Sequence, residues 1–166
     1  MRYKVREKVF AIGTDFWVTD EHDNRAFLID GKVLHIRQTL DIKDTSGGVL
    51  ATVRHKLMTV GETFEIERDG SKVGTVHKVL ISPLHHRYVI DLADGAQLEA
   101  VGNIADKDFE IRYGGQPLAR VSRAWLALRD TYGIDVPDGQ DDVLMIAIAV
   151  CIDRIHHDEV EKHRDR

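Results

Sequence analysis

Apolar and polar residues alternate along most of this chain, and the alternation stops repeatedly at short glycine-containing dipeptides. Alternation with a period of two is typical of strands that bury one face, and such dipeptides tolerate the positive φ angles of tight hairpin turns. Five turns are predicted in this way, at Asp30-Gly31, Gly47-Gly48, Asp69-Gly70, Asp94-Gly95 and Gly114-Gly115. A further hairpin is predicted to join residues 16–18 to residues 26–29. The pattern therefore predicts about a dozen strands.

Two of the predicted hairpins repeat each other in sequence. Residues 64–76 align without a gap with residues 109–121, at an offset of 45. The matching positions are Phe64/Phe109, Ile66/Ile111, Gly70/Gly115, Val73/Leu118 and Val76/Val121. Each copy is a strand, a turn and a returning strand, a unit that cannot bury its apolar face alone. We therefore expect several such hairpins to pack around one common core.

The run Val143–Ile152 is apolar at every position, unlike the alternating segments before it. A helix that is apolar on all sides must be surrounded by other elements, and the run is too short for a bilayer, which needs about 20 apolar residues. We predict a buried helix over about residues 140–156, followed by a charged tail over 157–166. The simplest fold is mostly β, a closed antiparallel barrel of about 12 strands wrapped around this single hydrophobic C-terminal helix.

Composition narrows the class of protein without identifying a function. The 166 residues contain three prolines and no low-complexity linker, so we expect one domain over residues 1–166. The lone Cys151 lies in the apolar run, which excludes an intrachain disulfide and a multi-cysteine zinc site. A formal net charge of −5, with both signs interspersed, argues against nucleic acid as a partner. The absence of a leader or transmembrane segment favours a cytoplasmic location.

Two C-terminal segments, residues 122–136 and 138–154, carry a resemblance to a known family. Ser122, Trp125, Asp130 and Tyr132, followed by the apolar run flanked by aspartates, are similar to the C-terminal signature of the LURP-one-related family. The resemblance implies a tubby C-terminal-like fold, shared with phospholipid scramblases, in which 12 strands surround a hydrophobic helix. Tubby proteins bind phosphoinositides and plant relatives are linked to pathogen defence. The resemblance supplies no catalytic residues.

Basic residues gather near the ends of several predicted strands. The candidate ligand-binding residues are Arg54, His55, Lys56, His77, Lys78, His85, His86, Arg87 and Arg123. Strand alternation places His55, Lys78 and Arg123 on the same face as the apolar residues two positions earlier, which is costly unless the strand ends, a bulge intervenes or the cation reaches an anion. One interpretation is a site for phosphate or an anionic headgroup. The other is a barrel rim whose cations extend into water.

The charged tail also allows a metal interpretation. If the helix continues, His156, Glu159 and His163 share one face, and imidazole and carboxylate groups bind zinc. The spacing does not match the catalytic His-Glu-x-x-His pattern, and a charged terminal turn accounts for these residues equally well. We therefore predict no metal site and no cofactor.

No motif in the chain indicates a specific reaction. A nucleophile elbow, a glycine-rich phosphate loop and a dinucleotide fingerprint are all missing from the sequence, so no catalytic residues are predicted. We expect a non-enzymatic binding, regulatory or scaffold module whose candidate ligands are an anionic phospholipid, phosphate or a protein partner. It would be cytoplasmic, with peripheral membrane attachment as an option. The alternatives are a membrane-associated, scramblase-like lipid-handling protein and an enzyme with an unrecognised site at the barrel rim.

Overall fold

The fold consists of twelve strands and one helix within the part of the chain that the structure describes. The structure is a computed structural model, and it describes residues 1–6, 15–34, 37–56, 62–82, 85–124, 126 and 131–165. The strands are β1 (Arg2–Arg6), β2 (Phe16–Asp20), β3 (Arg25–Leu34), β4 (Arg37–Lys43), β5 (Val49–His55), β6 (Thr63–Arg68), β7 (Ser71–Ser82), β8 (His85–Leu92), β9 (Gln97–Asn103), β10 (Asp108–Tyr113), β11 (Gln116–Ser122) and β12 (Thr131–Asp135). The helix is α1 (Asp142–Arg164).

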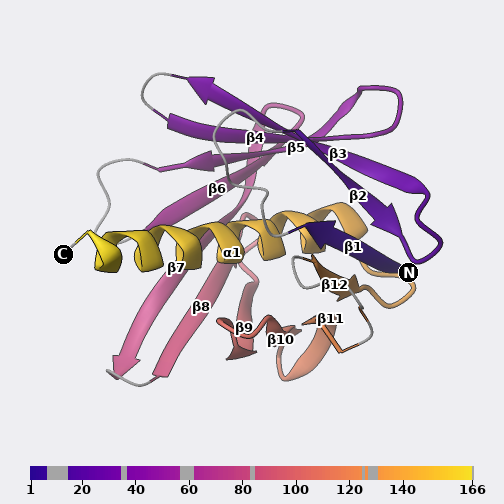
Figure 1. The fold of residues 1–166 in the computed structure, drawn as a ribbon. Helices are drawn as coiled ribbons and strands as arrows, with labels where there is room; N and C mark the ends of the chain where they lie inside the picture. Colours follow the sequence, from indigo (N-terminus) through magenta and orange to yellow (C-terminus); the bar gives the residue numbers. More distant parts are fainter. Residues whose placement is uncertain are drawn as a thin grey trace.

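The strands close into a barrel around the helix. Each strand from β2 to β12 pairs with the next along the chain, and β1 closes the barrel by pairing with both β2 and β12. All of these pairs are antiparallel. Figure 1 shows α1 passing through the middle of the molecule with strands on both sides. The predicted fold class, a barrel of about 12 strands around one C-terminal helix, is confirmed.

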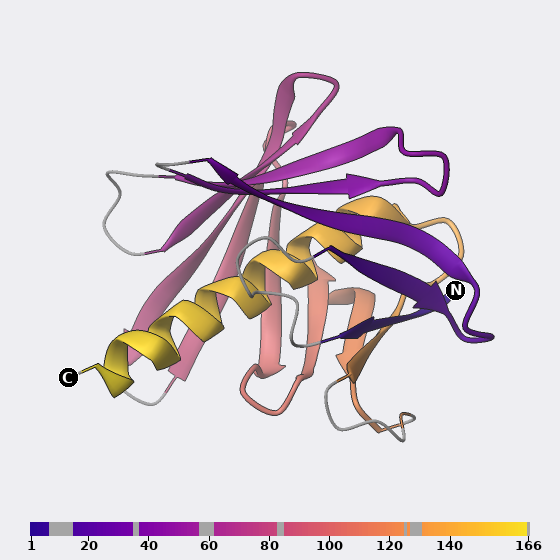
Figure 2. The ribbon, with the colours of Figure 1, turned by 45° about the horizontal axis from the view of Figure 1, so that its top comes forward.

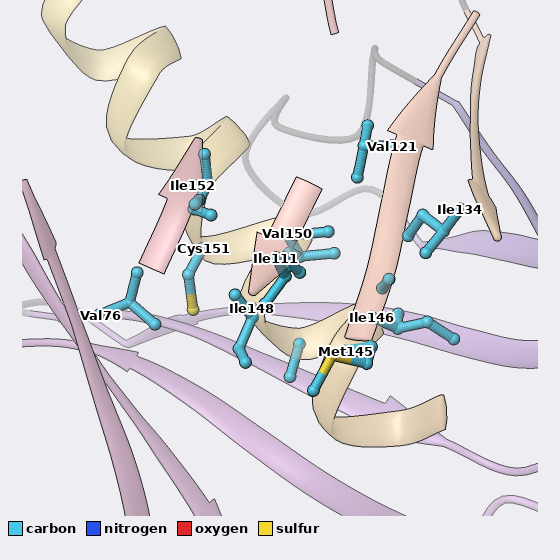
Figure 3. Packing of buried hydrophobic residues seen from close by; sticks show 14 of the residues in the cluster. Val76, Ile111, Val121, Ile134, Met145, Ile146, Ile148, Val150, Cys151 and Ile152 are labelled. Atoms are coloured by element: carbon cyan, nitrogen blue, oxygen red, sulfur yellow. The ribbon is translucent and has the colours of Figure 1, made fainter. Parts of the chain in front are cut away.

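The core is formed by the inner face of the barrel and the full circumference of α1. All ten residues from Met145 to Arg154 are buried, and Ile146, Ile148 and Ile152 are fully inaccessible. Figure 3 shows side chains of this segment directed toward residues of three different strands, Val76, Ile111 and Ile134. Cys151 is a free, buried cysteine, and burial raises the pKa of its thiol. A helix that is apolar on every side is thus accommodated because strands surround it.

The helix is longer than the sequence pattern predicts. It starts at Asp142, with the Asp141 carboxylate capping it through a hydrogen bond of 3.1 Å from the Leu144 amide, and it continues to Arg164. Residues assigned to a charged tail from position 157 are therefore helical as far as Arg164. The segment contains no glycine or proline, and its side chains form ion pairs with Lys78 of β7 and with Glu62 just before β6, which favours continuation of the helix beyond the apolar run.

Four of the five predicted glycine turns are hairpin turns, and the exception is Asp30-Gly31. Both residues of Asp69-Gly70 and of Gly114-Gly115 have positive φ, and so do Gly47 and Gly95. Asp30 and Gly31 instead lie inside β3, opposite Asp41 and Leu40 of β4. The prediction of a turn there was wrong because pairing across a long hairpin, with a 2.6 Å ion pair from Lys43 to Asp30, outweighs the local preference of the dipeptide.

The two hairpins that repeat in sequence also repeat in structure. Phe64 lies opposite Val76 in β6 and β7, and Phe109 lies opposite Val121 in β10 and β11. The register shift falls after Ile66 in one copy and after Ile111 in the other, which are matching positions of the repeat. The repeat therefore specifies the strands, the turn and the bulge.

Gly102 of β9 is the glycine where a side chain meets the most resistance. Its φ is +139°, and an added Cβ would lie 2.5 Å from the carbonyl oxygen of Asp108 and 2.7 Å from the Cα of Phe109. Because both are backbone atoms, Gly102→Ala is expected to destabilise the protein by about 2 kcal/mol or more. Gly115→Ala is the control: its φ is +81° but an added Cβ meets nothing within 4 Å, so about 1 kcal/mol is expected. Urea unfolding of both variants measures the difference, and equal losses would show that β9 and β10 do not approach this closely.

Candidate functional site

The inward-facing basic residues of β5 and β7 lie where α1 leaves the barrel. Val53 and Val76 are fully buried, and the residues two positions further along each strand are His55 and Lys78. Their side chains retain only 22% and 14% exposure, although both are polar. Figure 2 shows the C-terminal turns of α1 at the end of the barrel opposite the N-terminus. Both residues interact there with carboxylates.

Lys78 forms an ion pair with Glu159 of α1, which joins β7 to the helix. An inward-facing cation is tolerated where the strand ends, where a bulge intervenes or where the cation reaches an anion. Lys78 is the last of these cases, because its ammonium group reaches an anion. That anion is a side chain of the same protein. The pair is partly buried, with 28% of the Glu159 side chain exposed.

His55 takes part in a second connection between the strands and the helix. Its Nε2 lies 2.6 Å from Oε2 of Glu62, and Lys162 of α1 donates to the other oxygen of the same carboxylate. Burial alone would raise the pKa of Glu62, but the bonds from Lys162 and His55 hold it below its usual value. The hydrogen bond to Glu62 in turn raises the pKa of Lys162. We refer to His55, Glu62, Lys78, Glu159 and Lys162 as the helix-exit cluster.

Four of the remaining basic residues predicted for the site have partners outside the helix-exit cluster. These four pair with carboxylates of neighbouring strands: Arg54 with Glu67 (3.2 Å), Lys56 with Glu65 (3.3 Å), His77 with Asp91 (2.9 Å) and Arg87 with Glu99 (3.5 Å). Arg123 directly follows β11 and is half-buried. His85 and His86 are the first two residues of β8, and their side chains lie outside the described part of the structure.

Lys78→Ala is expected to leave the protein folded and to lower its stability by about 1 kcal/mol. A partly exposed ion pair contributes at most about this much, and the apolar core on either side of Lys78 is unchanged. Thermal unfolding followed by circular dichroism tests this, with the helical signal expected to persist at 25 °C. Loss of the folded state at that temperature would mean that the pair with Glu159 is essential for holding α1.

A buried ion pair further inside the barrel, between Lys107 and Asp153, was not predicted from the sequence. Lys107 pairs with Asp153 of α1, and each side chain is only 7% exposed. The Lys107 ammonium lies 5.9 Å from the centre of the Tyr132 ring, and Lys107 has a φ of +54°, which is rare for a residue with a Cβ. The sequence signals were a lysine next to a predicted strand and an aspartate ending the apolar run. Neither indicated the other, because they are 46 positions apart.

This ion pair shifts the titration of the groups around it. Burial raises the pKa of Asp153, and Lys107 draws it only part of the way back. Burial, reinforced by Lys107, lowers the pKa of His156, one turn further along α1. Burial also raises the pKa of Tyr132 well above its usual value. Lys107 and Asp153 thus form a buried ion pair beside His156, whose pKa is lowered, and Tyr132, whose pKa is raised.

The three residues considered for a metal do not form a common site. Glu159 pairs with Lys78, and His163 Nδ1 lies 2.8 Å from the Glu159 carbonyl oxygen. A different group, His157, Asp158 and Glu161, places one ligand atom of each residue within 4.8 Å of the others. Asp158 in that group already pairs with Arg154 at 3.2 Å.

Within the described ranges, no helical segment has both the length and the hydropathy of a membrane span.

These features define a class of small proteins in which a closed antiparallel barrel of twelve strands encloses a C-terminal helix. The predicted signature includes Ser122, which is buried at the end of β11, and Tyr132, which is buried in β12, whereas Trp125 and Asp130 lie outside the described residues. The family model described as LURP-one-related matches residues 1–153, and the chain belongs to this family.

Two further comparisons found proteins similar to this chain. The uncharacterized protein YxjI of Bacillus subtilis strain 168 is 26% identical over 158 residues, which cover 95% of each chain. The crystal structure of a protein from Arabidopsis thaliana superposes with a TM-score of 0.68 and covers 93% of this chain and 91% of that chain. Its sequence identity is 14%, so this likeness shows a shared fold.

Proposed function

We propose that this protein is a non-enzymatic binding module that recognises a phosphate-bearing anion, with an anionic phospholipid headgroup as its ligand, at the helix-exit cluster. The observation that carries the proposal is the convergence of basic side chains from three elements. His55 comes from β5, Lys78 from β7 and Lys162 from α1, and two carboxylates hold them in place. A multivalent phosphate interacts with several such donors at once through charge-assisted hydrogen bonds.

The carboxylates of the cluster orient its basic side chains, and Lys162 is the most accessible of these. Lys162 is 65% exposed, whereas His55 and Lys78 retain 22% and 14% exposure. Ion pairs with this exposure contribute about 1 kcal/mol or less, so a phosphate group with two or more charges competes effectively for the same cations. A net charge of −5 opposes general attraction to an anionic surface, so binding at the cluster would be local and selective. Such a module would act in the cytoplasm, at the membrane surface.

Co-sedimentation with liposomes tests the proposal. Vesicles of phosphatidylcholine alone, with phosphatidylserine, and with a phosphoinositide are compared at low and high salt. The protein is expected to pellet with phosphoinositide vesicles, and less so at high salt, because exposed charges are screened. Lys78→Ala with Lys162→Ala is expected to weaken binding about 30-fold, since each basic residue near an anionic surface contributes about 1 kcal/mol.

The matched control removes two positive charges from the outer surface of the barrel. Arg87→Ala with Arg120→Ala breaks pairs with Glu99, Asp108 and Glu110 and gives the same net charge as the cluster variant. We expect its binding to stay within about threefold of the wild type. If both double variants lost vesicle binding equally, the loss would be due to the change in net charge and not to the helix-exit cluster. Failure of the wild-type protein to pellet with any vesicle would refute lipid binding.

A further inference from the structure

A pocket lies at the end of α1 opposite the helix-exit cluster. It has a volume of about 340 Å³, at the lower end of the range for small-molecule sites. Three parts of the fold line it: the β8–β9 hairpin, the β10–β11 hairpin and the first turn of α1. The pocket forms where these elements meet at the mouth of the barrel, and it shares no residue with the helix-exit cluster.

The lining of this pocket is mainly apolar. The apolar side chains are those of Leu92, Ala96, Leu98, Leu118, Leu144 and Met145, and the Tyr113 ring lies at the edge with 52% exposure. Leu92, Leu118 and Leu144 are only partly buried, although each packs against the core. A ligand that covers them removes further apolar surface from water, which contributes about 25 cal/mol for each Å² buried. This surface suits a short alkyl chain.

The polar residues that line the pocket favour a ligand with a positive charge. They are Asp94, Gln140 and Asp141, and no lysine, arginine or histidine among the described residues lines the pocket. Arg68 and the Leu144 amide already use the Asp141 carboxylate. The Asp94 carboxylate accepts 2.9 Å from the Ala96 amide in the exposed β8–β9 turn, and no cation pairs with it among the described residues. Asp94 is therefore the acceptor available to a positively charged group.

We infer that this pocket binds a small amphiphile with a short apolar chain and an ammonium group. The chain occupies the space between the three leucines, and the ammonium group lies beside Asp94. The negative charge of Asp94 disfavours an anionic amphiphile of the same shape. The inference is independent of the proposed anion binding at the other end of α1, and either one stands if the other fails.

Three probes of equal chain length test both parts of the inference. Hexylammonium, hexanol and hexanoate are titrated separately into ¹⁵N-labelled protein at pH 7, and the amide signals of Ala96 and Leu144 are followed. Saturable shifts at these amides are expected for hexylammonium, with about threefold weaker binding of hexanol and the weakest binding of hexanoate, as one exposed carboxylate implies. Absence of saturable shifts would overturn the pocket as a site, and hexanoate binding as tightly as hexylammonium would overturn the selection by charge.

Two substitutions separate charge from shape. Asp94→Asn keeps an acceptor for the Ala96 amide and removes the charge, so hexylammonium is expected to lose its advantage over hexanol while hexanol binding is unchanged. Asp69→Asn, in the β6–β7 turn outside the pocket, is the matched control and is expected to leave all three affinities as in the wild type. Persistence of the ammonium preference in Asp94→Asn would contradict the role of Asp94. Loss of the preference in Asp69→Asn would attribute it to overall charge.

Discussion

Ile148→Asp is expected to abolish the folded state. Ile148 is fully inaccessible in the middle of α1, and Figure 3 shows it within the apolar cluster between the helix and the strands. Loss of its packing costs about 2–5 kcal/mol. A buried carboxyl must also take up a proton at pH 7, which costs about 4 kcal/mol given an ordinary pKa near 3.9. The sum is comparable with the whole stability of a domain, about 5–15 kcal/mol, so circular dichroism should show loss of cooperative unfolding.

Val160→Asp is the matched control for this substitution. Val160 lies on the same helix with 42% exposure, so the same new carboxylate stays in water. We expect its midpoint of thermal unfolding to remain within about 2 °C of the wild type, since surface substitutions change stability by about 0.5 kcal/mol or less. A cooperative, nearly native melting curve for Ile148→Asp would contradict the position of α1 inside the barrel.

Lys107→Met is the second substitution expected to have a large effect, a loss of about 3–5 kcal/mol at pH 7. It leaves the buried Asp153 carboxylate without its cation, and an unpaired buried charge is costly. The double substitution Lys107→Met with Asp153→Leu removes both charges. Its stability is expected to equal or exceed that of the wild type, because two apolar side chains replace a pair with a large desolvation cost. Urea unfolding of the single and double variants measures both effects.

The pH dependence of Lys107→Met gives an independent check. Burial raises the pKa of Asp153, and without Lys107 it rises further in the folded state, whereas the unfolded chain has an ordinary value near 3.9. Between these two values the folded protein binds a proton that the unfolded chain has released, so stability falls as pH rises. The loss relative to the wild type is therefore expected to be largest at pH 7 and small near pH 4. A loss that does not change with pH would mean that Asp153 titrates in the folded variant as it does in the folded wild type, and would contradict this role of Lys107.

Local patterns in the sequence sufficed for the barrel and its helix. Each local signal depends on only a few neighbouring residues: the alternation of a strand, the turn dipeptides whose residues have positive φ, and the uniformly apolar run. The two copies of the 45-residue repeat also have their bulge at matching positions. The pattern failed at Asp30-Gly31, where the partner strand decided the conformation. It also ended the helix too early, because ion pairs with distant strands support the segment that follows the apolar run.

The candidate site was predicted only in part, because its residues pair with residues that are distant in the sequence. Alternation correctly placed His55 and Lys78 on the inward-facing side of their strands, which posed the question of what neutralises them. The answer, Glu159 for Lys78, lies 81 positions away, and no local pattern connects the two. Spacing also grouped His156, Glu159 and His163, but these residues have other partners or surroundings in the structure. Long-range pairs of this kind become visible only once the strands are closed around α1.

Mapping of ligand contacts by NMR shows whether the helix-exit cluster is the anion site. A soluble phosphoinositide headgroup is titrated into ¹⁵N-labelled protein at low salt. Saturable shifts are expected at the amides of His55, Lys78 and Lys162, and these shifts are expected to be lost in the Lys78→Ala, Lys162→Ala variant. Shifts confined to the outer faces of β8 and β11, around Arg87 and Arg120, or the absence of any saturable shift, would contradict an anion site at this cluster.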